Sequence, residues 1–238
     1  MKPLAVIFDL DDTLIRAYAN RDAAWRNHIV EYAAALHPHD TVSVADAISS
    51  SAVRFWRETG VYERGGHDLQ AARRTIVGTA FRNLAIDAPS LVAEIADAFT
   101  AKRKQGYELF EDTLPVLTHL SDVGLKLGLL TNGGRDSQRA KLERFALSGS
   151  FDYIGISEEV GHAKPDAAMF EHALTALNAT AAKAWMVGDH LDWDIAGAQS
   201  VGMAAVWFNP GEVSVPSGSA PDHVITTLSQ LLGLLENA

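Results

Sequence analysis

The stretch Leu4-Ala5-Val6-Ile7-Phe8-Asp9-Leu10-Asp11-Asp12-Thr13 determines how we interpret the rest of the chain. Its first five residues are an apolar run of the length of a buried strand. Asp9, Asp11 and Asp12 follow at once, and three carboxylates so close together repel one another unless a cation offsets them. Mg²⁺ prefers such hard oxygen ligands. The stretch therefore predicts a strand that ends in a magnesium site, the alternative being an Asp-rich turn in which Asp12 or Thr13 caps a helix.

Four more apolar runs of strand length lie in the second half of the chain: Leu125–Leu130, Tyr153–Ile156, Ala184–Val187 and Ala204–Phe208. Segments with helical spacing follow three of them: Ser137–Phe145, Asp166–Leu177 and Asp192–Val201. Strands that alternate with helices at this spacing indicate right-handed βαβ units. We therefore expect an α/β fold, with a doubly wound parallel sheet and helices on both of its faces.

The stretch from about Arg16 to Lys104 does not alternate in this way. It carries helical apolar spacing in four groups, separated by Gly and Pro residues: Trp25/Ile29/Leu36, Val44/Ile48/Ala52/Phe55, Leu69/Ala72/Ile76/Ala80/Leu84 and Leu91/Ile95/Phe99. A helical block inserted after the first strand predicts a second, smaller domain, seated over the carboxyl edge of the sheet. The expected domains are residues 1–15 with 106–238 for the α/β core and residues 16–105 for the helical insert.

Composition excludes several classes of protein. The 238 residues carry 20 basic and 30 acidic side chains, a formal net charge of -10, with 47% hydrophobic residues and no cysteine. The acidity argues against nucleic acid and anionic membranes as partners, and no apolar run is long enough to span a bilayer. The lack of cysteine removes disulfides and thiolate catalysis and fits a reducing cytosol, so we expect a cytoplasmic protein. The oligomeric state cannot be derived from the sequence.

Three further segments place polar groups where predicted strands end. They are Thr131-Asn132-Gly133-Gly134, Lys164-Pro165 before a helix, and Gly188-Asp189 followed by Asp192 and Asp194. Taken singly, each has an ordinary explanation as a turn, a surface lysine or a helix start. Ligands of open α/β sheets bind beyond the carboxyl ends of the strands. The joint occurrence of these segments with Asp9 therefore predicts one phosphate and metal site.

Asp9-Leu10-Asp11-Asp12-Thr13, Thr131-Asn132-Gly133, Lys164-Pro165 and Gly188-Asp189 with Asp194 resemble, in order and spacing, the four motifs of the haloacid dehalogenase-like hydrolase superfamily. The resemblance covers nearly the whole chain and implies a Rossmann-like core with an all-helical cap domain. Asp12 stands where many members have glycine, as in some phosphatases of the family.

The resemblance implies a role for each motif residue. Asp9 is the nucleophile that forms an aspartyl-phosphate, and Asp11 is the acid that protonates the leaving alcohol and later the base that deprotonates water. Thr131 and Lys164 bind the transferred phosphoryl group, with help from Asn132 and Gly133. Asp9, the backbone carbonyl of Asp11 and Asp189 hold Mg²⁺, which Asp194 supports through water.

These implications predict a magnesium-dependent phosphatase that acts on a small phosphorylated metabolite, with a cap that closes over the site. The dehalogenases of the family lack an acid at the position of Asp11, because a halide leaves without a proton. A phosphosugar mutase and a catalytically silent binding protein remain as alternatives. A signalling receiver domain fits poorly, since it has neither the helical insert nor the Gly188-Asp189 element. Arg16, Arg21, Arg57, Arg64 and Arg73 are candidate substrate contacts, with solvated surface as the alternative for each.

Overall fold

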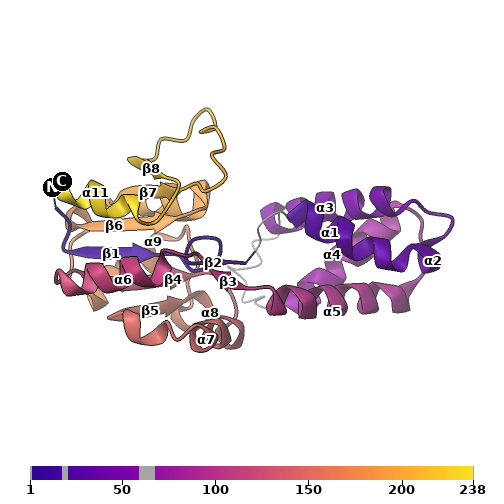
Figure 1. Cartoon of the computed structure of the whole chain (residues 1–238). Coiled ribbons are helices and arrows are strands. Elements are labelled where there is room, and N and C mark those ends of the chain that lie inside the picture. The colour runs from indigo at the N-terminus through magenta and orange to yellow at the C-terminus, as the bar shows by residue number, and fades with distance from the viewer. Residues whose placement is uncertain (1, 18–20, 59–67, 238) are drawn as a thin grey trace. The chain divides into compact units, whose positions relative to one another are not determined.

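The structure is a computed structural model that describes residues 2–17, 21–58 and 68–237. The chain divides into two compact units (Figure 1). The first contains Met1–Arg16 and Glu108–Ala238, and the second contains Ala17–Tyr107. Within the described residues, no helix combines the length and the apolar character that crossing a membrane requires.

The first unit is built on a six-stranded parallel sheet with the strand order β5-β4-β1-β6-β7-β8. Five strands lie where apolar runs predict them, and β8 is an addition that the sequence analysis did not predict. The strands are β1 (Ala5–Phe8), β4 (Lys126–Thr131), β5 (Tyr153–Ile156), β6 (Ala184–Gly188), β7 (Ala204–Phe208) and β8 (His223–Ile225). Because β1 pairs with β4 on one side and with β6 on the other, the strand order reverses at β1.

Both faces of the sheet are buried, which explains why its strands are continuous apolar runs. Ala5 and Ile7 of β1 pack with Phe170 in one hydrophobic cluster. Since side chains alternate along a strand, the buried Val6 and Phe8 face the opposite side. Figure 1 shows α9 behind the strands and α6 in front of them. The predicted doubly wound α/β fold is therefore confirmed.

The helices of the first unit mostly follow the strands in order. They are α6 (Thr113–Asp122), α7 (Arg135–Arg144), α8 (Ser157–Val160), α9 (Ala167–Ala176), α10 (Gly197–Ser200) and α11 (Gln230–Glu236). Short 3-10 turns cover Ser148–Ser150 and Ala181–Lys183, and Leu191–Ala196 is a π-helix. The last helix predicted from sequence, Asp192–Val201, is thus a π-helical turn followed by the short α10.

A two-stranded antiparallel ladder lies where the chain leaves and re-enters the first unit. It joins β2 (Ile15–Arg16) to β3 (Glu108–Leu109). Beside it, the Thr113 hydroxyl donates a hydrogen bond to the carbonyl oxygen of Leu14 at 2.9 Å. The segment that follows Asp11 and Asp12 is therefore anchored to the start of α6.

The second unit is helical, with its own hydrophobic core. Its helices are α1 (Arg21–Ile29), α2 (Ala33–Leu36), α3 (Thr41–Glu58), α4 (Leu69–Asn83) and α5 (Pro89–Gln105), and a 3-10 turn covers Val30–Tyr32. The spacing Trp25/Ile29/Leu36 predicts one helix there, whereas the structure has two helices joined by this turn, where Val30 and Tyr32 are weak helix formers. Asp68 caps α4, and Pro89 begins α5. The core includes Trp25, Ile29, Ile48, Ile76 and Phe99.

Candidate active site

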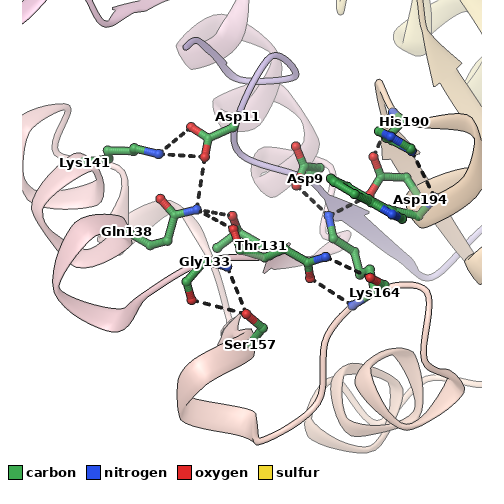
Figure 2. Close-up of polar contacts among 12 residues, drawn as sticks. Asp9, Asp11, Thr131, Gly133, Gln138, Lys141, Ser157, Lys164, His190 and Asp194 are labelled. Carbon is green, nitrogen blue, oxygen red and sulfur yellow. Dashed lines mark hydrogen bonds and ion pairs between the residues drawn. The ribbon is translucent and has the colours of Figure 1, made fainter. Parts of the chain in front are cut away.

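The predicted site residues of the first unit meet at the carboxyl edge of the sheet. Asp9 follows β1, Thr131 ends β4, and Asp189 follows β6. These three strands are neighbours, because β1 lies between β4 and β6. Lys164 joins them from the segment between α8 and α9, and Figure 2 shows its side chain pointing toward Asp9 and Asp194. The strand-order reversal at β1 is where open α/β sheets bind ligands.

A buried lysine lies between two buried carboxylates. Lys164 Nζ lies 2.5 Å from Asp9 Oδ1 and 2.6 Å from Asp194 Oδ1. The three side chains are 2%, 9% and 1% exposed, respectively. A buried ammonium is unfavourable unless it is paired. The surface position considered for Lys164 is therefore wrong, and the charge of this lysine belongs to the site.

The acidic groups at this edge are electrostatically crowded. Burial raises the pKa of Asp9 to about 7. The positive charge of Lys164 opposes this rise, and the negative charge of Asp194 adds to it. The pKa of Asp189 is also raised by burial and by Asp9. Burial alone would lower the pKa of Lys164, but Asp194 and Asp9 raise it above the ordinary value. One lysine thus compensates only part of the negative charge.

The carboxylates are close enough to share a cation. One oxygen each from Asp9, Asp189 and Asp194 lies within 4.8 Å of the others. Oxygen donors and uncompensated negative charge are what a divalent cation such as Mg²⁺ requires. Asp194, expected to act through water, has its carboxylate in this same cluster. The donor set therefore fits the predicted metal.

The π-helical turn after β6 holds Asp194 in the site. The backbone N–H of His190 donates to Asp194 Oδ2 at 3.0 Å, and His190 Nδ1 accepts from the N–H of Trp193 at 3.2 Å. The rings of His190 and Trp193 stack with centroids 3.9 Å apart. A side chain at Gly188 would overlap the carboxyl group of Asp194. Glycine is therefore needed where β6 ends, so that Asp194 can reach Lys164.

The two residues after β4, Asn132 and Gly133, connect β4 to the segments that contain Lys164 and Ser157 through hydrogen bonds. The Asn132 amide donates to the carbonyl of Lys164 at 2.8 Å and accepts from its backbone N–H at 2.9 Å. The N–H of Gly133 donates to Ser157 Oγ at 2.9 Å. In this structure Asn132 and Gly133, which the sequence analysis assigned to substrate binding, thus bond to the protein itself. They hold the β4 end and the Lys164 segment together.

The side chain of Asp11 lies apart from the metal cluster. Lys141 Nζ approaches its Oδ1 at 2.7 Å and its Oδ2 at 2.6 Å, and Gln138 donates to Oδ2 at 3.0 Å (Figure 2). Sequence analysis missed Gln138 and Lys141, both on α7. The available signal was weak, because α7 is polar on most of its surface and its spacing does not reveal which polar residues face inward.

Among the arginines considered for substrate contact, Arg73 is not at the solvated surface. It is 5% exposed, on α4 of the second unit, and its guanidinium lies 5.5 Å from the centre of the Phe99 ring. Arg16 is exposed, and its guanidinium lies 4.8 Å from the centre of the Phe110 ring. The side chains of Arg21 and Arg57, and the whole of Arg64, lie outside the described residues.

Comparison with known proteins points to one family. The family profile described as haloacid dehalogenase-like hydrolase matches residues 3–202. The chain is 32% identical over 240 residues to ribulose-1,5-bisphosphate 5-phosphatase from Halopiger xanaduensis. The alignment covers 97% of this chain and 98% of the relative.

Two solved structures are similar along nearly the whole chain. A 2-haloacid dehalogenase from Pseudomonas syringae is 31% identical with a TM-score of 0.63, covering 100% of this chain and 99% of that one. A HAD phosphatase from Thermococcus onnurineus is 28% identical with a TM-score of 0.66, covering 99% and 98%.

Proposed function

The chain belongs to the haloacid dehalogenase-like hydrolases, and from this premise we propose that it is a magnesium-dependent phosphatase that hydrolyses a small phosphomonoester through an aspartyl-phosphate. The family resemblance drawn from the four motifs is confirmed. The names of similar proteins include both phosphatases and a dehalogenase, so the choice between these chemistries rests on the residues of the site.

Asp11 is the observation that carries the proposal. A phosphomonoester releases an alcohol, which is a poor leaving group unless an acid protonates its oxygen. Displacement of a halide needs no such acid. Asp11 lies two residues beyond Asp9, near enough that its charge contributes to the raised pKa of the Asp9 carboxyl. A second carboxylate two residues from the nucleophile, close enough to act on its charge, therefore supports phosphate chemistry.

The first step is a displacement at phosphorus. A carboxylate oxygen of Asp9 forms a bond to phosphorus as the bond to the alcohol oxygen breaks, and Asp11 gives its proton to that oxygen. Lys164 favours the ionised form of Asp9 that this attack requires. Thr131 and Lys164 contact the transferred phosphoryl oxygens, and Asn132 and Gly133 keep the segments of these two residues in register.

The second step regenerates the enzyme. Asp11 takes a proton from a water molecule as the water oxygen attacks phosphorus, and the bond from phosphorus to Asp9 breaks. Inorganic phosphate leaves, and Asp9 is again a carboxylate. Mg²⁺, held by Asp9, the backbone carbonyl of Asp11 and Asp189, would reduce the repulsion between the carboxylate and the phosphate when bound, with Asp194 supporting it.

We assign the helical unit as the cap domain and place it at residues 16–105, as the sequence predicts. Two observations support the assignment: the unit Ala17–Tyr107 is compact, and it has a hydrophobic core of its own. The core domain comprises residues 1–15 and 106–238.

Phosphate release from a panel of phosphomonoesters tests the proposal. The panel contains sugar phosphates, nucleoside monophosphates, phosphorylated hydroxy acids and p-nitrophenyl phosphate, each with Mg²⁺ or with a chelator. Asp9→Asn serves as the inactive variant. Asp136→Asn serves as the matched control, since the Asp136 side chain is 92% exposed.

We expect magnesium-dependent release by the wild type and by the Asp136 variant, and none by the Asp9 variant. Failure of the wild type on every compound, or chloride release from 2-chloropropionate in place of phosphate release, would contradict the proposal.

A further inference from the structure

Two polar side chains of α7 are buried although neither belongs to the four motifs. Gln138 and Lys141 are 2% and 3% exposed. They lie three residues apart and therefore share one face of the helix. Burying an ammonium and an amide costs free energy unless both find partners. Figure 2 shows both side chains pointing toward Asp11.

Lys141 engages the whole carboxylate of Asp11. Its Nζ is 2.7 Å from Oδ1 and 2.6 Å from Oδ2. The side chains of Lys141 and Asp11 are only 4% and 17% exposed, so solvent screens this ion pair little. The contact restricts the direction in which Asp11 can present its oxygens.

Gln138 connects Asp11 to the phosphate-binding segment. Its Nε2 lies 3.0 Å from Asp11 Oδ2, 2.7 Å from Thr131 Oγ1 and 2.9 Å from the carbonyl oxygen of Asn132, so its two hydrogens are shared among three acceptors. An amide rotated by 180° would place its oxygen against these acceptors, so the orientation is determined by the contacts. Because Thr131 Oγ1 accepts from Gln138, the hydroxyl hydrogen of Thr131 is left to donate elsewhere.

We propose that Gln138 and Lys141 are positioning residues for phosphoryl transfer, which hold the Asp11 carboxylate toward the leaving oxygen and direct the Thr131 hydroxyl hydrogen toward a phosphoryl oxygen. The inference rests on the proposed function and adds two residues to its site. Neither residue contacts the substrate in this account, because each acts through Asp11 or Thr131.

The two carboxylate oxygens of Asp11 differ in their hydrogen-bond partners. Among the described residues, Oδ2 bonds to both Lys141 and Gln138, whereas Oδ1 bonds to Lys141 alone. Oδ1 therefore has fewer donors around it, and we assign the proton transfers of the proposed function to this oxygen. It gives the proton to the leaving alcohol oxygen in the first step and receives one from water in the second. Gln138 keeps Oδ2 in place during both transfers, and Lys141, which contacts both oxygens, keeps the carboxylate group from rotating.

The test compares substrates that differ in their need for a proton. An alkyl phosphate requires Asp11 to protonate its leaving oxygen, whereas p-nitrophenolate is a stable anion and leaves without this help. We expect Lys141→Met and Gln138→Met to lower kcat/KM for the alkyl phosphate by roughly 100-fold, and for p-nitrophenyl phosphate only several-fold. Lys141→Arg should recover part of the loss.

Matched controls remove the same functional groups from other parts of the first unit. Lys126→Met removes an exposed lysine that pairs with Asp152 at 2.8 Å, and Gln199→Met removes an amide that donates to Asp222 at 3.0 Å. Both control variants should have the wild-type kcat/KM for the alkyl phosphate and for p-nitrophenyl phosphate. Urea unfolding of each variant verifies that it is folded before its rates are compared.

A double-mutant cycle separates positioning from general structural support. In an Asp11→Asn background, Lys141→Met should cause little further loss on the alkyl phosphate, because the group that it positions is already gone. Equal losses of the Lys141 variant on both substrates, or additive losses in the cycle, would overturn the positioning of Asp11, while the phosphatase activity would still stand. A wild type that hydrolyses neither substrate would instead overturn the proposed function, and the inference with it.

Discussion

Replacing Lys164 by methionine removes the only cation that the structure places between Asp9 and Asp194 in the described part of the chain. Methionine keeps the length of the side chain and loses the ammonium, which lies 2.5 and 2.6 Å from the two carboxylates. All three side chains are at least nine-tenths buried. The substitution therefore leaves two carboxylates in a poorly solvated place without a counter-charge.

The expected loss of stability is large. Removal of one partner from a buried ion pair costs about 3–5 kcal/mol of unfolding free energy, and we expect a loss in this range at pH 8 without metal. The matched variant Lys126→Met breaks a pair whose side chains are 57% and 40% exposed. Exposed pairs contribute about 0–1 kcal/mol, so this control should change little.

The loss should depend on pH in a defined direction. In the wild type the folded-state pKa of Asp9, about 7, lies above the ordinary value of 3.8. Its contribution to stability therefore falls as the pH rises from about 4 to about 7. In the variant this fall should continue above pH 7, because Lys164 no longer opposes the rise of the Asp9 pKa. The difference in unfolding free energy between the Lys164 variant and the wild type should therefore increase above pH 7. Bound Mg²⁺ should make this difference smaller, because it supplies a positive charge beside Asp9.

Urea unfolding at several pH values measures this difference. The two compact units can unfold separately, which would invalidate a two-state analysis. Trp25 and Trp56, the tryptophans of the second unit, are therefore replaced by phenylalanine in all samples, so that fluorescence reports the sheet unit. Equal losses in the Lys164 and Lys126 variants, or a Lys164 loss that does not change with pH, would refute the reasoning.

Three further predictions concern the carboxylate cluster. Asp189→Ala should weaken Mg²⁺ binding about tenfold or more in calorimetry, and an unchanged Kd would remove Asp189 from the ligand set. Because the pKa of Asp9 is about 7, wild-type affinity for Mg²⁺ should rise from about pH 6 to 8 with proton release; affinity independent of pH would contradict this. Gly188→Ala should cost about 1–3 kcal/mol through overpacking against Asp194, whereas unchanged stability would show that the turn can shift.

The sheet was largely predictable because a parallel strand covered on both faces is a short, continuous apolar run. The strand β8 was not predicted, since it has only three residues and its Val224 is exposed at the sheet edge. The helix α6 was likewise missed. Its sequence contains Pro115 in the first turn, a position that helices tolerate, and the sequence analysis assigned no element to this stretch.

Within the site, residues at strand ends were predictable and residues on helix faces were not. Asp9 and Asp189 follow parallel strands and Thr131 ends one. The carboxyl ends of such strands meet at one edge of the sheet, independently of the loops. Lys141 lies on a helix in which most residues are polar, so its spacing does not separate an inward lysine from a solvated one. Arg73 illustrates the same limit in the second unit, where only the structure reveals that it is buried against Phe99.

The central claim is that Asp9 carries the phosphoryl group during turnover. Acid quenching of the enzyme in the steady state, followed by mass spectrometry of the peptide that contains Asp9, tests it most directly. The account predicts a phosphorylated peptide with the wild type and magnesium, and neither phosphopeptide nor phosphate release with Asp9→Asn. Phosphate release by the Asp9→Asn variant at the wild-type rate would contradict the claim.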